Sequence, residues 1–227
     1  TQEAWQLSGK SLLSSIQSIK LLDPLTTLSE RITGLDNATT LLSDLSAQSL
    51  SEVIGISSWR QIQKSEDGQI RPIEIGYAHI ESRIGTKNEV GAGKESNQEK
   101  GLVVEIHSRI IPDQESQIVT DTSGYYWMSF DGKEEIWSST STRWKGKIRT
   151  TQKETGIRQR PSLGNPNPKL LILRQDLTSN RQLPPIEATV SSPWLPKTLS
   201  WVIGPLIETT RPTTLSWRTL NDFVDPP

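Results

Sequence analysis

The chain has 227 residues, a formal net charge of −1 and no cysteine. The near-neutral charge excludes the global basic excess typical of nucleic-acid-binding domains, although it leaves room for a local basic patch. The absence of cysteine excludes disulfides, thiol nucleophiles and cysteine-ligated metal sites. Hydrophobic residues make up 33% of the chain, which is enough for one core. We therefore expect one large domain with a smaller helical part.

The first residue is threonine and the only methionine is Met128, so translation does not start at residue 1. This favours a chain cleaved in the cell, as after a signal peptide, and a trimmed chain boundary is the alternative. The expected location is therefore extracytoplasmic: the periplasm, the envelope or the extracellular space. No apolar run reaches the ~18 to 20 residues that a membrane-spanning helix needs, so we expect no transmembrane segment.

The first 60 residues show the periodicity of helices. Apolar residues recur at spacings of three and four between positions 12 and 22, before Pro24, and again between positions 39 and 53. Residues 33–37 are turn-like. The sequence thus predicts a helical N-terminal segment at 1–60, without any strand of four or more residues, and a β domain at 61–227.

After residue 70 the period changes from 3.6 to 2. Residues 76–84 and 102–110 alternate apolar and polar side chains, which predicts two half-buried antiparallel strands. Asp131-Gly132 is a strong signal for a two-residue hairpin turn, and we expect Trp127 and Trp137 beside it to be buried. Further strands are expected at 143–150, 170–173 and 214–220.

Residues 193–207 predict an apolar helix, because Pro193 suits a first helical turn and the following apolar residues share one face. The candidate hydrophobic groove on this helix comprises Trp194, Leu195, Leu199, Val202 and Leu206. The predicted fold class is α+β and mainly antiparallel β. It consists of a large curved sheet, a packed C-terminal helix at about 193–207 and a helical N-terminal segment.

Residues 70–220 share a pattern with one known family. Gly76-Tyr-Ala-His opens a long hairpin, strands continue through Thr150, and Pro193-Trp-Leu-Pro196 begins a helix that would plug the concave face. This pattern resembles the curved-sheet envelope proteins of bacteria, the lipoprotein-carrier-like half-barrels. The resemblance implies a concave face that holds an acyl chain or docks a partner.

The two histidines, His79 and His107, fall on the polar faces of the first two predicted strands. Together with neighbouring Glu and Arg residues they form a candidate acid–base cluster, whose alternative is a solvent-facing ladder of charge pairs. We favour the ladder, in a register whose opposing positions sum to 188. That register sets Arg83 opposite Glu105 and Glu81 opposite His107, two favourable pairs that outweigh the poor pair of His79 with Arg109. We expect no catalytic residue, no cofactor and no metal site.

A cationic stripe is the strongest local anomaly of the sequence. On one strand at 143–150, one side would carry Arg143, Lys145, Lys147 and Arg149, and the other Trp144 and Ile148. Such a stripe is a candidate site for an anionic partner: a lipid headgroup, an acidic polysaccharide, a nucleic-acid backbone or an acidic protein. Its alternative is a solvated strand face. Specific nucleic-acid binding is not expected.

These patterns favour a non-enzymatic exported binding or scaffold protein. Two alternatives stay open: a carrier of a lipid or hydrophobic ligand, and an accessory subunit of a larger complex. A large apolar cavity between the sheet and residues 193–207 would favour the carrier. An exposed apolar patch would favour the subunit.

Overall fold

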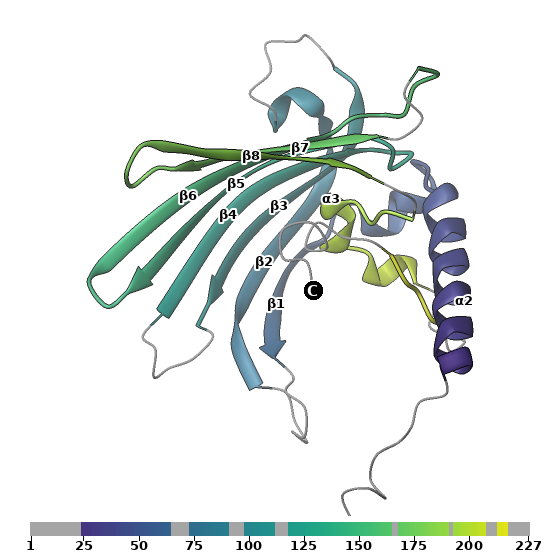
Figure 1. Cartoon of the computed structure of the whole chain (residues 1–227), viewed down its shortest axis with the longest axis horizontal. Helices are drawn as coiled ribbons and strands as arrows, with labels where there is room; N and C mark the ends of the chain where they lie inside the picture. Colours follow the sequence, from purple (N-terminus) through teal and green to yellow (C-terminus); the bar gives the residue numbers. More distant parts are fainter. Residues whose placement is uncertain are drawn as a thin grey trace, which may run out of the picture.

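A computed structural model describes residues 24–64, 73–90, 98–111, 118–164, 168–190, 193–207 and 213–217. Its main feature is one antiparallel sheet in which every strand pairs with its neighbours in sequence order (Figure 1). The strands are β1 (Ser57–Lys64), β2 (Ile73–Thr86), β3 (Lys100–Ile110), β4 (Ile118–Ser129), β5 (Glu135–Lys145), β6 (Ile148–Arg158), β7 (Lys169–Asp176) and β8 (Arg181–Thr189).

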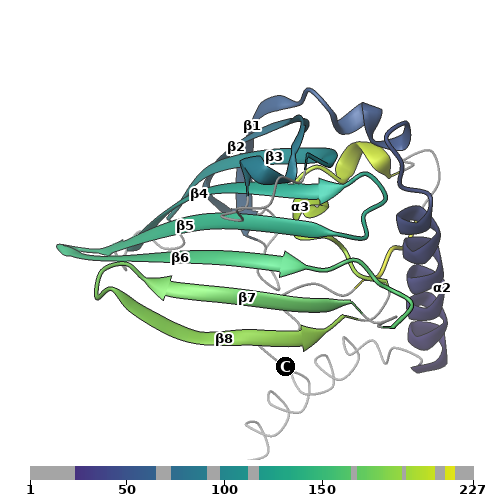
Figure 2. The same ribbon diagram turned by 90° about the horizontal axis from the view of Figure 1, so that it is seen from above.

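The helices are few and stand at one end of this sheet. They are α2 (Pro24–Ser43), α3 (Lys197–Ser200) and the 3-10 turns η1 (Ser49–Val53), η2 (Lys87–Glu89) and η3 (Gly204–Leu206). Figure 2 shows the curved sheet from above, with α2 along one end and α3 between α2 and the strands. The predicted class, α+β and mainly antiparallel β, is confirmed. None of the described helices is long and apolar enough to cross a membrane.

The two faces of the sheet are covered differently. The inner face, which we define by Leu102, Val104 and Ile106 of β3, packs against η1 and the α3 segment in the main core. The outer face carries a smaller cluster around Val103 and Trp127, near the η2 connection. Elsewhere in the described strands the outer face is largely polar and open to solvent.

Buried polar groups fix the α3 segment to the inner face. The carboxylate of Glu135 is fully buried and accepts hydrogen bonds from Arg158 Nε at 2.9 Å and Trp194 Nε1 at 2.9 Å. Its second oxygen accepts the backbone N–H of Lys197 at 2.7 Å. The Lys197 ammonium reaches Glu154 at 2.7 Å and lies 5.0 Å from the centre of the Trp137 ring. These contacts satisfy groups whose burial would otherwise be costly.

The helical prediction for the N-terminal segment needs correction. Strand β1 begins at Ser57, so the expectation of no strand in residues 1–60 is wrong. The predicted helix at 12–22 lies outside the described residues. Helix α2 runs through the predicted turn at 33–37, because tertiary contacts support it there: Ser216 N–H donates to Gly34 O at 2.9 Å and the Asn37 amide donates to Thr214 O at 3.0 Å.

Two hairpin predictions also change. Trp127 and Trp137 are fully buried, as expected, but five residues (130–134) connect β4 to β5 instead of two. The strand predicted at 143–150 is wrong, because the chain reverses within it. Gly146 adopts a φ of 58° between Lys145 and Ile148, which pair across a two-residue turn. Glycine is the residue that tolerates this conformation at the first position of such turns.

The C-terminal predictions are correct in packing and wrong in extent. The helix expected at 193–207 is reduced to α3 and η3. Pro193 and Pro196 delay its start, since proline lacks a backbone N–H, and α3 already ends at Ser200, before Gly204-Pro205 begins η3. Residues 213–217 form no strand, and 218–220 lie outside the described residues. Strand β8 was not predicted because it contains Pro184-Pro185, which an edge strand can accommodate.

Candidate functional site

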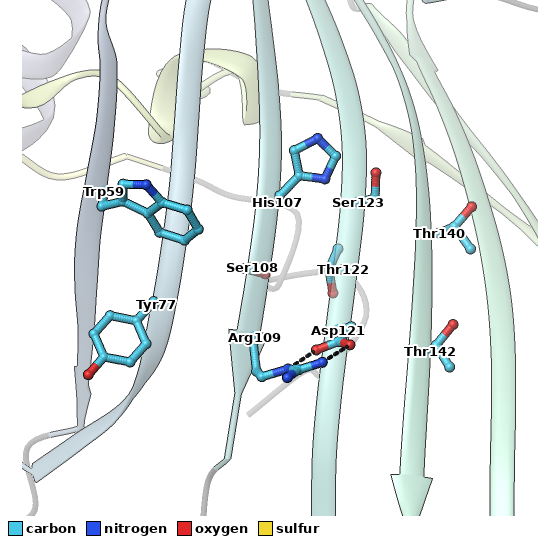
Figure 3. Close-up of a pocket in the computed structure, with 10 residues that line it drawn as sticks. All are labelled: Trp59, Tyr77, His107, Ser108, Arg109, Asp121, Thr122, Ser123, Thr140 and Thr142. Carbon is cyan, nitrogen blue, oxygen red and sulfur yellow. Dashed lines mark hydrogen bonds and ion pairs between the residues drawn. The ribbon is translucent and has the colours of Figure 1, made fainter.

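An open groove of about 540 Å³ crosses the outer face of the first five strands. The pairing of the strands sets its side chains in two rows. One row runs from Trp59 through His79, His107 and Ser123 to Thr140, and the next runs from Tyr77 through Arg109 and Asp121 to Thr142. Figure 3 shows the groove residues from this side, with the two aromatic rings at one end and the threonines at the other.

Aromatic side chains form one wall of the groove. Trp59 on β1 is 72% exposed, and Tyr77 on the neighbouring β2 is 51% exposed. The Trp59 ring packs against His79, with the ring centres 4.9 Å apart and the planes tilted by 43°. A hydrogen bond to Glu74 raises the pKa of the Tyr77 hydroxyl, so this group stays neutral and polar near neutral pH. The wall therefore offers flat apolar surface with a polar tip.

An arginine–carboxylate pair forms the floor of the groove. Arg109 donates from Nε to Asp121 Oδ1 and from Nη2 to Oδ2, both at 2.7 Å, in a bidentate pair (Figure 3). This contact holds the pKa of Asp121 below its ordinary value, so the carboxylate is charged near neutral pH. Arginine has five N–H donors and the pair uses two, which leaves three for a ligand or solvent. The side chains remain 63% and 30% exposed.

A second carboxylate, Glu105, lies beside the groove. His107 Nε2 donates to Glu105 Oε1 at 2.9 Å, and the Tyr125 hydroxyl is also bonded to it. Burial opposes ionisation of Glu105, but the hydrogen bonds from His107 and Tyr125 outweigh it and lower its pKa. The same contact with Glu105 raises the pKa of Tyr125. His107 is thus held in place by a neighbour on its own strand.

The register of β2 and β3 differs from the predicted one. His79 lies opposite His107 and Glu81 opposite Glu105, so opposing positions sum to 186. The prediction weighed cross-strand charge pairs, which contribute only tenths of a kcal/mol. The charged groups instead find partners along their own strands or on β1, as in the His107–Glu105 contact and the packing of His79 on Trp59. Apolar pairing on the inner face, such as Ile80 with Ile106, is compatible with either register.

The groove contains a histidine and a serine, which raises the question of catalysis. Ser123 is the cross-strand neighbour of His107. In the described part of the chain, however, no hydrogen bond joins the two, and His107 Nε2 is directed to Glu105. No group of three or more His, Asp or Glu side chains in these residues is placed to hold a metal ion. The arrangement suits hydrogen bonding to a ligand better than nucleophilic attack.

The cationic stripe predicted from the sequence is divided by the turn at Gly146. Arg143 and Lys145 belong to the inner face of β5, and Lys147 lies in the turn. Arg149 belongs to the outer face of β6, with its guanidinium 6.0 Å from the centre of the Trp144 ring. The four cations therefore surround the tip of the β5–β6 hairpin instead of lining one side of a strand.

The five candidate groove residues of the C-terminal segment belong to the core or its margin. Trp194, Leu195, Leu199 and Val202 are each at most 6% exposed, and Leu206 is partly buried against them. These side chains pack on the inner face, with Leu199 beside the groups that hold Lys197. The sequence pattern correctly indicated that these side chains form a contact surface. We predicted a ligand on this surface, whereas the structure shows the inner face of the sheet there.

No protein-family model matches the chain, and neither the characterised proteins nor the solved structures compared with it give a significant match. The site therefore rests on its geometry alone. Sequence reasoning missed Trp59 because β1 has a single strongly apolar inner residue, Ile62. It missed Asp121 because the Arg109–Asp121 pair depends on the length of the β3–β4 connection. No apolar alternation marks residues 57–64, because their two apolar side chains, Trp59 and Ile62, lie on opposite faces.

Proposed function

We propose that the chain is a non-catalytic binding protein and that its outer groove binds a saccharide. The observation that carries this proposal is the pairing of an exposed aromatic wall, Trp59 and Tyr77, with the bidentate Arg109–Asp121 pair across one groove. A pyranose ring has an apolar face of C–H groups and an edge of hydroxyls. The wall fits the ring face and the ion pair fits the edge.

The physical match has two parts. The faces of aromatic rings carry partial negative charge, which attracts the partially positive C–H groups of a sugar ring. Asp121 accepts hydrogen bonds from sugar hydroxyls, and the remaining N–H groups of Arg109 donate to their oxygens. Thr140 and Thr142, at the far side, offer hydroxyls that both donate and accept. The groove is open, which suits an extended chain of sugars better than an enclosed small molecule.

The inner face supports the carrier alternative less well. A carrier of a lipid would need apolar space between the sheet and residues 193–207. Trp194 and Leu199 instead pack into the core there, and the Glu135 carboxylate binds the start of α3. An accessory-subunit role would place a partner protein on the outer face, where it would compete with a saccharide for Trp59.

A saccharide panel tests the proposal. The protein is applied to immobilised neutral oligosaccharides of glucose, galactose and N-acetylglucosamine, and hits are measured by isothermal titration calorimetry. Trp59→Ala is expected to weaken binding at least tenfold, because it removes the aromatic wall. Asp121→Asn is expected to weaken it as well, since the amide breaks the bidentate pair.

Trp144→Ala is the matched control, because Trp144 is a partly exposed tryptophan on the same face that does not line the groove. It is expected to bind as the parent chain does. Binding of no saccharide on the panel, or equal binding by Trp59→Ala and the parent chain, contradicts the proposal.

A further inference from the structure

The tip of the β5–β6 hairpin concentrates unpaired positive charge. Between positions 143 and 153 the sequence has five cations and no carboxylate, although the whole chain has a net charge of −1. All five side chains are exposed, and within the described residues none of them forms an ion pair. Four of them, Arg143, Lys145, Lys147 and Arg149, flank the turn, and Lys153 lies further along β6, opposite Thr140.

Apolar side chains accompany this charge. Ile148, between Lys147 and Arg149, is 69% exposed at the very end of the hairpin. The Trp144 ring is partly exposed beneath the Arg149 guanidinium. The tight turn at Gly146 places these groups at the outermost point of the two strands. A single exposed isoleucine is ordinary on a protein surface, so its weight here comes from its position among Trp144 and the cations.

The neighbouring hairpins also carry exposed aliphatic side chains near their connections. Because the sheet is a meander, the strand ends that flank the β1–β2, β3–β4, β5–β6 and β7–β8 connections all lie at one end of it, away from α2 (Figures 1 and 2). Each of these connections has an exposed aliphatic residue beside it: Ile73 at 49%, Ile111 at 40%, Ile148 at 69% and Leu177 at 41% exposure. This end, which we call the hairpin end, thus combines aliphatic side chains with cations.

We propose that the hairpin end docks on the surface of an anionic lipid membrane. Lys and Arg side chains would contact the phosphates, while Ile148 and Trp144 enter the interface between headgroups and acyl chains. Each cation near an anionic bilayer strengthens binding roughly fivefold, so the four cations at the tip give a strong preference for charged lipid. The exposed aliphatic residues favour a bilayer over nucleic acid, whose backbone rewards the cations alone. This inference is independent of the saccharide groove.

Vesicle co-sedimentation tests it. The intact chain is incubated with vesicles of phosphatidylcholine alone and of phosphatidylcholine mixed with phosphatidylglycerol, at low and high salt. Binding is expected to the mixed vesicles only and to weaken with salt. The double variant Lys145→Ser with Lys147→Ser is expected to bind roughly 25-fold more weakly. Ile148→Ser is expected to lower binding several-fold. Because Ile148 is already exposed, this replacement leaves the core intact.

The matched control is Lys100→Ser with Lys133→Ser, which removes two exposed lysines at the opposite end of the strands. It is expected to bind as the parent chain does, as is Trp59→Ala in the groove. Equal binding to neutral and mixed vesicles, or an equal loss in the control, overturns the proposal. Tight binding to double-stranded DNA that is unchanged by Ile148→Ser overturns it in favour of a nucleic-acid partner. Circular dichroism of each variant verifies that it is folded.

Discussion

Two of the arginine–carboxylate pairs join neighbouring strands and have the same chemistry in opposite settings. Arg158 and Glu135 lie under the α3 segment, with side chains 5% and 0% exposed. Arg109 and Asp121 lie on the outer groove, with side chains 63% and 30% exposed. The buried pair forms its further hydrogen bonds with Trp194, Lys197 and the backbone of the β4–β5 connection. The exposed pair keeps donors and acceptors free.

The same interaction can thus serve structure or binding, depending on its burial. A buried ion pair that loses one partner leaves an uncompensated charge in a medium of low polarity. Breaking an exposed pair lowers the free energy of unfolding only a little, because water replaces the missing partner. We therefore expect the inner pair to control stability and the outer pair to control ligand binding, and the following variants are ordered by the size of their expected effect on stability.

Replacement of Glu135 should have the largest effect. Glu135→Ala removes the acceptor for Arg158, Trp194 and the Lys197 backbone together. The free energy of unfolding should fall by about 3 to 5 kcal/mol, measured by urea denaturation. A loss smaller than that of Asp121→Asn would show that the buried pair does not anchor the α3 segment.

Two adjacent tyrosines on opposite faces give an alkaline test. Burial raises the pKa of Tyr126 to about 12, from an ordinary value of 10.0. Because the folded-state pKa is raised, the neutral hydroxyl stabilises the fold below pH 10 and this contribution disappears between pH 10 and 12. It amounts to up to about 3 kcal/mol.

Denaturant unfolding at a series of alkaline pH values measures this step. Tyr126→Phe should remove it, since phenylalanine does not ionise. Tyr125→Phe is the comparison variant. Tyr125 is 40% exposed and its pKa is raised by Glu105, not chiefly by burial, so this variant should retain most of the step. If both variants lose stability between pH 10 and 12 in parallel with the parent chain, Tyr126 is not the source of this loss.

A third prediction concerns close packing in the core. A Cβ at Gly156 would lie 2.0 Å from the Trp137 ring, so only glycine fits beside this buried tryptophan. Gly156→Ala should lower the free energy of unfolding by about 1 to 3 kcal/mol through overpacking. Gly164→Ala is the control, since no atom lies within 4 Å of its Cβ position. Equal thermal midpoints for the two variants would contradict this packing.

The smallest effect on stability is expected for Asp121→Asn. Its ion pair is exposed, so the free energy of unfolding should change by less than about 1 kcal/mol. Saccharide binding should nevertheless weaken, which separates the two functions of the two pairs. A stable variant with unaltered saccharide binding would show that the outer ion pair does not contact the ligand.

The sequence predicted the parts of the fold that repeat a pattern. The alternation in 76–84 and 102–110 located β2 and β3, and the tryptophans beside Asp131-Gly132 are buried as expected. Features set by tertiary contacts were not predictable. Arg143 to Arg149 alternates through a turn, so its period alone cannot reveal that Gly146 reverses the chain. The groove escaped prediction because it depends on strand register, which weak charge pairs do not determine.

The most direct test of these separate roles follows the outer and the inner arginine–carboxylate pairs in one NMR spectrum. In two-dimensional ¹H–¹⁵N NMR, the Nε–H signals of Arg109 and Arg158 and the indole N–H signals of Trp59 and Trp137 are followed during titration with the tightest-binding saccharide of the panel. We expect the Arg109 and Trp59 signals to shift in proportion to saturation while those of Arg158 and Trp137 stay in place. Shifts confined to Arg158 and Trp137, or absent from Arg109 and Trp59, would contradict it.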